Sequence, residues 1–499
     1  MTHSIKTQGH GKSHRTMINK SKLKYLYNKN RGMIIIQTLV FSVVMIVVIG
    51  ALAGWTATTV KSGRINFNRE QAFQSAEAGI DYYRWHLAHA PTDYKDGTNG
   101  EGPYVHSLKD KNGNTVGQFS LEITAPSIGS TLVKIKSTGE SSFDSSFKRT
   151  ITSEVAKPSI AKYSFAGNNA MRFGAGTEIF GPVHVNGGIR FDGLAHNIVT
   201  SGTTTYTDTD SDACTTTNSW GVHTCLSPAD PISPIALSSR PDVFEAGRLI
   251  SQPTINFSSF TTDMASLKSK AISNGFYRDT AGIGYVGYHI VLKTNNTFDL
   301  YKINSWASLG NCYSSPSSVP SWSIGTQSFQ GNFAYPANGV FFMEDHIVVD
   351  GQINQNRLTI TAATLPIPSN PANYKNIIIN NDILYSFYDG KDALGLIAQG
   401  GVMVGLISDN DLKIDGALIA QNNRVGRFYY YGSYCSYKNR SVISLYGMIA
   451  SYVRYGFAYT NNTGYAIRNI TYDASLLYAP PPDFPLTSDQ YQILSWQEN

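Results

Sequence analysis

The chain has 499 residues, of which 15% are charged and 12% are aromatic, including 30 Tyr. Soluble proteins typically carry roughly 25% charged residues, so the composition is typical of an extracellular β-rich protein of two or three domains. The formal net charge is +5, but eight Lys and Arg lie in residues 1–32, and subtracting them leaves −3 for the remainder. Because nucleic-acid binding needs basic residues gathered on a folded domain, the charge distribution gives it no support.

An uncharged segment follows this basic start. Residues 32–60 contain no charged side chain, and the apolar stretch from Met33 to Trp55 is 23 residues long. A helix needs about 20 such residues to cross a bilayer. Since no Asp or Glu precedes the segment, the charge asymmetry predicts a cytoplasmic N-terminus and an external remainder.

The helical pattern continues beyond the apolar segment, but there the apolar residues lie on one face only. Phe73, Ala76, Ile80, Tyr83 and Leu87 recur in steps of three and four residues. That spacing predicts one apolar stripe along a helix. We expect one helix from about residue 36 to residue 89, near 80 Å long at 1.5 Å per residue, with Pro91 just after its end.

The motifs of this region resemble those of a known family. The basic leader ends in Arg31-Gly32, the apolar helix begins at the next residue, and residues 71–87 include Ala-Glu-Ala-Gly at 76–79. Over about residues 25–90 the chain resembles a type IV pilin-like prepilin, with a helix like that of PilX-type minor pilins. The resemblance implies cleavage between Gly32 and Met33 by a prepilin peptidase. At the fifth mature position, where the family usually has Glu, this chain has Gln37.

The resemblance also implies a location and partners. The helix would hold the protein in the cytoplasmic membrane and pack against other pilins and the pilus assembly machinery, placing the head at the cell surface after assembly. Gln37 would then lie at an assembly position, where its amide can only hydrogen-bond. The alternative is a signal-anchored surface binding protein without a filament.

Composition and hydrophobic patterning divide the chain into four regions. We expect a leader at 1–32, a transmembrane and amphipathic pilin-like helix at 33–95, a small antiparallel β sheet at 96–160 and an extracellular head at 161–499. Short alternating strands around 119–123, 133–135 and 147–155 predict the sheet. In the head, short apolar couplets flank Gly or Asn, and Leu396-Ile397 recurs 22 residues later at Leu418-Ile419.

Such a repeat is typical of a β-solenoid, resembling a parallel β-helix. A β-sandwich head is the alternative fold. We expect insertions at about 200–340, including a helix over 261–273 with Ile272 on its packed face, and at 426–440, where Tyr is abundant. The tail with Trp496 is expected to lie across the last coil.

Other candidate sites are few. Cys214, Cys225, Cys312 and Cys435 all lie on the external side, where disulfides persist, and the sequence allows three pairings. Alternating Asp208, Asp210 and Asp212 form a weak Ca²⁺ candidate, since an EF-hand would need other residues at two further positions. A solvated Thr/Asp loop is the favoured interpretation of the pattern. No other metal and no cofactor is expected.

An enzymatic role has little support in the motifs. A β-helix can be a polysaccharide lyase or hydrolase, and such enzymes need two carboxylates across a groove. Asp409, Asp411 and Asp415 lie close in sequence, but turns also favour Asp for backbone reasons. The sequence therefore favours a structural pilin-like protein, with surface adhesion as its possible task, over an enzyme.

Processing gives the first testable prediction. We expect the exported protein to begin at Met33, because the basic leader ends at Gly32 and the apolar helix begins directly afterwards. N-terminal sequencing of protein recovered from the membrane fraction measures this. An intact Met1 would remove the pilin interpretation and leave the signal-anchored alternative.

Overall fold

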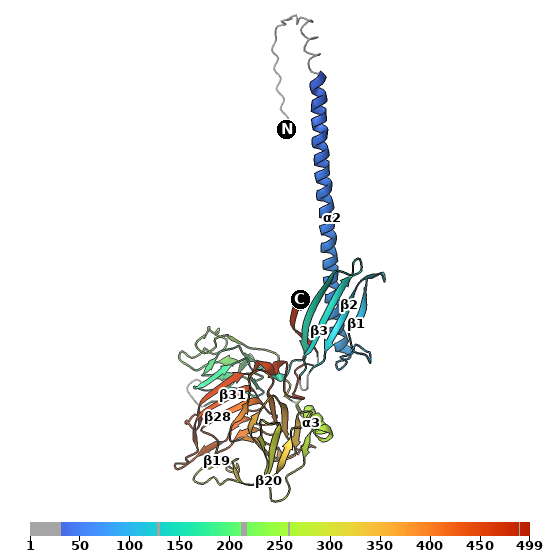
Figure 1. The fold of residues 1–499 in the computed structure, drawn as a ribbon. Helices are drawn as coiled ribbons and strands as arrows, with labels where there is room; N and C mark the ends of the chain where they lie inside the picture. The colour runs from blue at the N-terminus through green and yellow to red at the C-terminus, as the bar shows by residue number, and fades with distance from the viewer. Residues whose placement is uncertain (1–30, 127–129, 211–216, 258–259, 489) are drawn as a thin grey trace, which may run out of the picture.

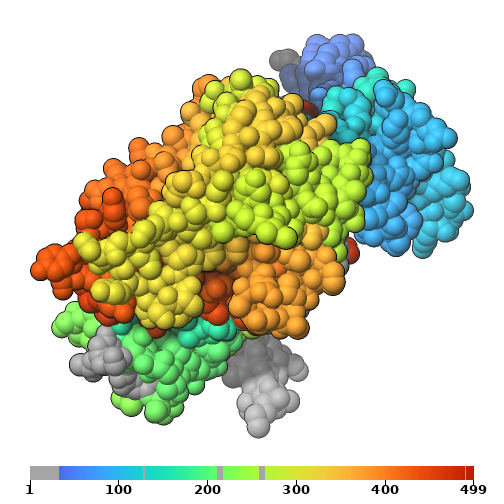
Figure 2. Space-filling view, turned by 90° about the horizontal axis from the view of Figure 1, so that it is seen from below, coloured from blue at the N-terminus to red at the C-terminus, as the bar shows by residue number. Residues whose placement is uncertain are grey.

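The computed structural model describes residues 31–126, 130–210, 217–257, 260–488 and 490–499. One long N-terminal helix is followed by mostly β structure with both parallel and antiparallel pairing. A small sheet packs against the lower half of the helix, and a larger β-rich head lies beyond it (Figure 1). Seen from below in Figure 2, the blue-to-cyan helix and sheet stand at one side of the head.

Helix α2 (Arg31–His89) is 59 residues long, which corresponds to roughly 88 Å at 1.5 Å per residue. It ends two residues before Pro91, as expected, because the residue before a proline disfavours helical geometry. The upper half stands free of the rest of the chain (Figure 1). The predicted stripe is confirmed in the lower half: Ala76, Ile80, Tyr83 and Leu87 are buried and Phe73 is partly buried, all packed on the small sheet.

The small sheet has five antiparallel strands, two more than the sequence predicted. In spatial order they are β1 (Tyr104–Lys109), β2 (Thr115–Thr124), β3 (Val133–Ser141), β4 (Lys148–Ala156) and β33 (Gln492–Glu498). Their alternating burial places Leu121, Ile135 and Ile151 in one core with the helix stripe. The sheet therefore covers the apolar face of the helix and leaves its polar face to solvent.

The fifth strand corrects the expectation for the C-terminal tail. Residues 492–498 do not lie across the last coil of the head; they return to the small sheet and pair with β4. Trp496 packs edge-on against Phe73 of α2, with ring centroids 5.9 Å apart. The physical reason is that the outer edge of β4 has unpaired backbone groups, which an added strand satisfies. The stretch before this strand contacts the head: Thr359 donates to the carbonyl of Pro482, Asp483 pairs with Lys270 of the head, and Phe484 is buried there.

Two glycines let the sheet approach the helix closely. A Cβ at Gly139 of β3 would lie 2.1 Å from the carbonyl oxygen of Ala72, and one at Gly117 of β2 would lie 2.2 Å from Oγ of Ser75. Both distances are far below van der Waals contact. The small helix residues and the glycines opposite them therefore set the spacing between α2 and the sheet.

The head contains rows of short parallel strands stacked on one another. The longest row pairs in this order: β16 (Phe276–Arg278), β21 (Val340–Met343), β23 (Arg357–Ala362), β26 (Ala393–Ala398), β28 (Asp411–Ala420), β31 (Asn439–Ser451), β5 (Phe165–Gly167), β8 (Val183–Val185), β11 (Val199–Ser201) and β15 (Arg248–Leu249). Leu396 lies opposite Leu418 in this row. The recurring pair in the sequence therefore corresponds to neighbouring strands.

Two further rows lie beside the first, and the last of them shares β22 with the second row and β28 and β31 with the first. One joins β17 (Gly287–Leu292), β22 (Ile347–Ile353), β24 (Ile377–Ile379), β27 (Val402–Val404) and β29 (Val425–Arg427). The other joins β22, β25 (Ile383–Tyr385), β28, β31, β32 (Gly464–Tyr472), β7 (Thr177–Phe180) and β10 (Leu194–Ala195). Side chains from all three rows form one continuous apolar core.

Spatial order and chain order differ within the head. Strand β5, the first of the head, stacks on β31, which lies almost 300 residues later in the sequence. Helix α3 (Phe260–Asn274) then leads the chain to β16, at the opposite end of the row. Met264, Leu267 and Ala271 of α3 are buried as expected, but Ile272 is 59% exposed. The expectation that Ile272 lies on the packed face was wrong. The buried residues of α3 follow one another in steps of three and four, and Ile272 directly follows Ala271.

The predicted insertion at 200–340 consists partly of an antiparallel extension. Strands β18 (Thr297–Trp306) and β20 (Ile324–Ala334) continue from β17 as a meander. Smaller parallel strands at the other end are β6 (Met171–Phe173), β9 (Ile189–Phe191) and β14 (Val222–His223). The head is therefore a parallel stack with antiparallel additions.

The close helix–sheet contact generates a stability prediction. Gly139→Ala should lower the free energy of unfolding of the small sheet domain by about 1–3 kcal/mol, because the new methyl group overlaps the backbone of α2. Gly100→Ala is the matched control, since its nearest neighbour atom would be 3.9 Å away. Thermal unfolding of both variants measures the difference. Equal melting temperatures would show that the two layers can separate at no cost.

Candidate functional site

The upper half of α2 is the most unusual surface of the molecule. Its large apolar side chains are exposed on every side, for example Phe41 at 71% and Trp55 at 70%. By length and composition this helix can cross a membrane. A helix that is apolar all round is stable only when lipid or protein surrounds it.

The processing residues lie at the start of this helix. The bond between Gly32 and Met33 falls in the first turn of α2, and the Gln37 side chain is exposed one turn further along. Within the described part of the chain, the side-chain amide of Gln37 makes no hydrogen bond. Its amide is therefore available to a neighbouring polar group in lipid or in another helix.

A groove lies where the free half of the helix meets the sheet. Phe67 of α2 and Phe143 of the β3–β4 turn pack edge-on, with ring centroids 5.7 Å apart, yet Phe143 remains 73% exposed. The groove beside them has a volume of about 1420 Å³ and is lined by one helix face, including Ala57, Val60 and Gly63. Small and apolar side chains on the helix allow a rod-shaped partner to approach it closely.

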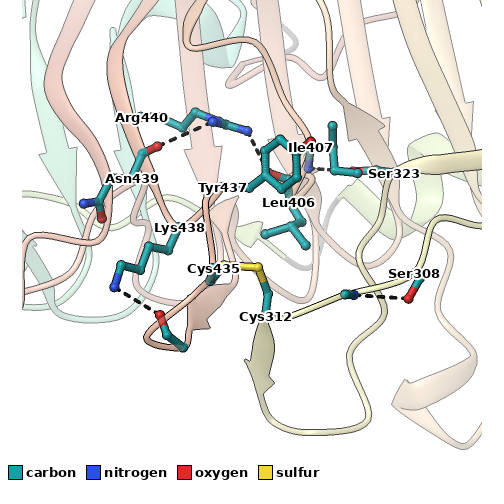
Figure 3. Close-up of a disulfide and its surroundings, with 12 residues drawn as sticks. Ser308, Cys312, Ser323, Leu406, Ile407, Cys435, Tyr437, Lys438, Asn439 and Arg440 are labelled. Carbon is teal, nitrogen blue, oxygen red and sulfur yellow. Dashed lines mark hydrogen bonds between the residues drawn. A yellow bond between two sulfur atoms is a disulfide. The ribbon is translucent and has the colours of Figure 1, made fainter.

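A second candidate surface is the Tyr-rich insertion at 426–440, which a disulfide fastens to the head. Cys312 and Cys435 are bonded across 123 residues, and Leu406 and Tyr437 lie beside the bridge (Figure 3). Strand β30 (Tyr429–Tyr431) pairs with β19 (Tyr313–Ser315), so two insertions that are distant in sequence form one antiparallel ribbon.

Buried groups beneath the ribbon hold it in place. The guanidinium of Arg427 donates to the carbonyls of Gly405, Leu406, Tyr437 and Lys438. Burial lowers the pKa of Arg427 to about 10, which still leaves it charged at neutral pH. The buried hydroxyl of Tyr430 donates to backbone carbonyls of the β19–β20 connection. The insertion is therefore ordered by hydrogen bonds as well as by the disulfide.

Other tyrosines of the ribbon face outward. Tyr434 is 85% exposed and Tyr313 is 62% exposed, while Tyr431 stacks between Tyr313 and Tyr429. Tyrosine offers a large, rigid and amphipathic contact area at low entropic cost. This exposed set on an anchored base is suited to contact another surface.

The Ca²⁺ candidates from the sequence already have cationic partners. Asp210 is paired with Arg454 at 2.6 Å and with Arg172 at 3.3 Å, and buried Asp208 lies 3.6 Å from Nη1 of Arg190. Asp212 lies outside the described residues. Asp208 and Asp210, two of the three acids of this weak candidate, are therefore already paired with guanidinium groups.

A possible metal-binding group includes Asp208, His223 and Cys225, whose ligand atoms all lie within 4.8 Å of one another. Cys225 is disulfide-bonded, so its sulfur is not a thiolate ligand. The fourth cysteine, Cys214, lies outside the described residues. All four cysteines were disulfide candidates, and Cys312–Cys435 and the bond of Cys225 agree with that expectation.

The three acids considered for catalysis do not share one site. Asp409 lines a cleft of about 700 Å³, and its pKa is raised by burial and by the charge of Asp382. Asp415 is buried instead, where it accepts hydrogen bonds from the backbone of Tyr385 and the hydroxyl of Tyr388. Asp411 is exposed on β28 and is not part of the cleft lining.

Two acids of this cleft were missed in the sequence. Asp350 and Asp382 both line it, and they precede the paired residues Gly351 and Ile383 of neighbouring strands. Both lie in short apolar couplets of the sequence, Asp350 within β22 and Asp382 directly before β25. Asp350 is paired with His289 at 3.0 Å, and Asp382 accepts from the backbone of Lys413. Asp350 and Asp382 therefore each have a partner on a neighbouring strand.

Comparisons with known proteins give limited results. No protein-family model matches the chain, and no curated protein matches it. Among solved structures, the competence-associated pilin ComZ from Thermus thermophilus aligns over 87% of this chain and 98% of its own, at 14% identity and a TM-score of 0.28. A TM-score this low carries no argument. The chain's own long apolar helix is the feature that fits an anchored, pilin-like protein.

The disulfide generates the prediction for this region. Replacing Cys312 and Cys435 together by Ser should lower the free energy of unfolding by about 2–5 kcal/mol, because the bridge closes a long loop in the unfolded chain. Tyr434→Ser is the control in the same insertion, and it should change stability by less than about 0.5 kcal/mol because the ring is exposed. Chemical unfolding of the two proteins gives the comparison. An unchanged midpoint in the double variant would mean that Arg427 and Tyr430 alone hold the ribbon.

Proposed function

We propose that this chain is a minor pilin or pseudopilin-like structural protein. It is cut by a prepilin peptidase, anchored by α2 in the cytoplasmic membrane, and joined to a type IV filament or its assembly machinery. It displays its head at the cell surface, with adhesion as the role of the head. The observation that carries the proposal is the division of α2 into an upper half exposed on all sides and a lower half buried against a sheet.

The division supports assembly as well as anchoring. In lipid, helices associate through close packing and interhelical polar contacts rather than through the hydrophobic effect. The upper half offers Gly50 and Gly54, whose Cβ positions are open, and the single amide of Gln37. The groove beside Phe143 extends this surface just beyond the expected membrane boundary. Neighbouring pilin helices are the partners that fit a surface of this shape.

The head is proposed to be a β-solenoid. Three rows of parallel strands with one continuous core support this interpretation over a sandwich. A stack of this kind is rigid and holds its insertions outward. The exposed tyrosines of the disulfide-bonded ribbon support a binding role, and no catalytic role is proposed because Asp409, Asp411 and Asp415 do not converge.

The groove provides a test of filament incorporation. Gly63→Phe fills the groove with an aromatic ring, whereas Ser62→Phe adds the same ring at a position outside the groove lining. We expect Gly63→Phe to lower the amount of protein in sheared filaments by about tenfold, equivalent to about 1.4 kcal/mol of lost packing. Both variants should stay in the membrane fraction.

Quantitative immunoblotting of filament and membrane fractions measures the effect. Equal incorporation of both variants would exclude the groove as a contact surface. Absence of the wild-type protein from filaments in cells that make them would instead support the signal-anchored surface protein, which keeps the same helix and head.

A further inference from the structure

The groove beside Phe143 lies at the level where α2 is expected to leave the membrane. Lys61 is the first charged residue after the apolar segment, and at 1.5 Å per residue it lies about 42 Å along the helix from Met33. A bilayer is roughly 40–45 Å thick including both headgroup layers. With Met33 at the cytoplasmic surface, Lys61 therefore reaches the external headgroups, and Trp55 lies near the external end of the hydrocarbon layer, where Trp is enriched.

Two cations of the groove have no partner within the described part of the chain. Lys61 and Arg64 both line it, and because they are three residues apart they lie on the same face of the helix. Both are exposed, and among the described residues neither makes an ion pair or a side-chain hydrogen bond. Since membrane orientation is set by basic residues on the cytoplasmic side, this external pair does not serve orientation. It is free to bind an anion.

An aromatic turn of the small sheet forms the opposite wall. Phe143 and Phe147 come from the β3–β4 turn and line the groove. Phe143 is 73% exposed, although it packs edge-on against Phe67 of α2. The start of the turn is fastened to the helix, since the hydroxyl of Ser141 lies 3.1 Å from Oδ1 of Asn68. An exposed aromatic ring held at this level is suited to the membrane interface, where the apolar rings of surface-bound segments are buried.

The groove is apolar toward the membrane and cationic beyond it. The part that precedes Lys61 is lined by small or apolar side chains, including Ala53 and Ala57. Among the described lining residues Asp144 is the one acid, and its carboxylate already accepts from the backbone N–H and the hydroxyl of Ser146 within the turn. Two cations against one carboxylate leave the lining with a net positive charge. The groove therefore fits an amphiphile with an anionic head and an apolar tail.

We propose that, before filament assembly, this groove holds an anionic phospholipid of the external leaflet of the cytoplasmic membrane. The phosphate pairs with Lys61 and Arg64, the acyl chains lie along Ala53 and Ala57, and Phe143 covers the lipid from the side of the sheet. The inference rests on the proposed function and extends it, because a neighbouring pilin helix must displace the lipid to enter the groove. The lipid also fixes the small sheet at the membrane surface until that exchange.

Native mass spectrometry of the full chain, purified from membranes in a nonionic detergent, tests the proposal. The protein is titrated with phosphatidylglycerol, with phosphatidylcholine of the same acyl chains, and with inorganic phosphate. We expect phosphatidylglycerol to bind at concentrations about tenfold lower than phosphatidylcholine, because only the first has a net negative head for the two cations. Inorganic phosphate should leave no adduct, since it has no acyl chains for the apolar part of the groove.

Two pairs of variants locate the lipid. Arg64→Gln should weaken phosphatidylglycerol binding by about tenfold, whereas Arg69→Gln removes the same charge from an exposed position of α2 outside the groove lining and should have no effect. Phe143→Ser should weaken the binding of both lipids, and Phe329→Ser, which removes a ring 58% exposed on the head, is its control. All four side chains are exposed, so the variants should keep the fold.

Equal binding of the two phospholipids, or equal binding by Arg64→Gln and Arg69→Gln, would overturn the proposal. The measurement needs no filaments, so it is independent of the filament experiment. If lipid binding is selective but Gly63→Phe and Ser62→Phe enter filaments equally, the groove is a lipid site and not a filament contact. If Gly63→Phe alone is lost from filaments but lipid binding is unselective, the filament contact stands and the lipid proposal is rejected.

Discussion

The structure depends on keeping the upper half of α2 out of water. Each turn of this segment exposes apolar side chains in all directions, and nothing in the described part of the chain covers them. Burial of a single large aliphatic side chain contributes about 1.5–3 kcal/mol, so a segment with this many exposed residues requires a surrounding apolar phase. Lipid and a bundle of like helices both meet this requirement. In the lower half of the same helix, the apolar residues form one stripe, and the small sheet of the same chain covers it.

The contact between helix and sheet is set by small residues. Ala72 and Ser75 on α2 face Gly139 and Gly117 on the sheet, so the two layers pack backbone against backbone at these points. The larger residues Tyr83 and Leu87 are buried between the two layers further along the helix. A rigid junction follows from this packing. The small sheet therefore has a defined orientation relative to the helix.

Local patterns predicted those parts that local forces determine. The stripe from Phe73 to Leu87 and the repeat at Leu396 and Leu418 are periodic, and both were predicted correctly as a helix face and as a stacked pair. The pairing of β33 with β4 was not predictable, because more than 300 residues separate strands that share no distinguishing pattern.

The order of strands in the head has a consequence for how the chain folds. Strand β5 needs β31 as its neighbour, and β4 needs β33, so both the head and the small sheet contain pairings that only the last part of the chain completes. Pairings between distant segments slow folding, because the loop must close before any contact forms. Until then β4 has an open edge, which is a site for unwanted strand pairing.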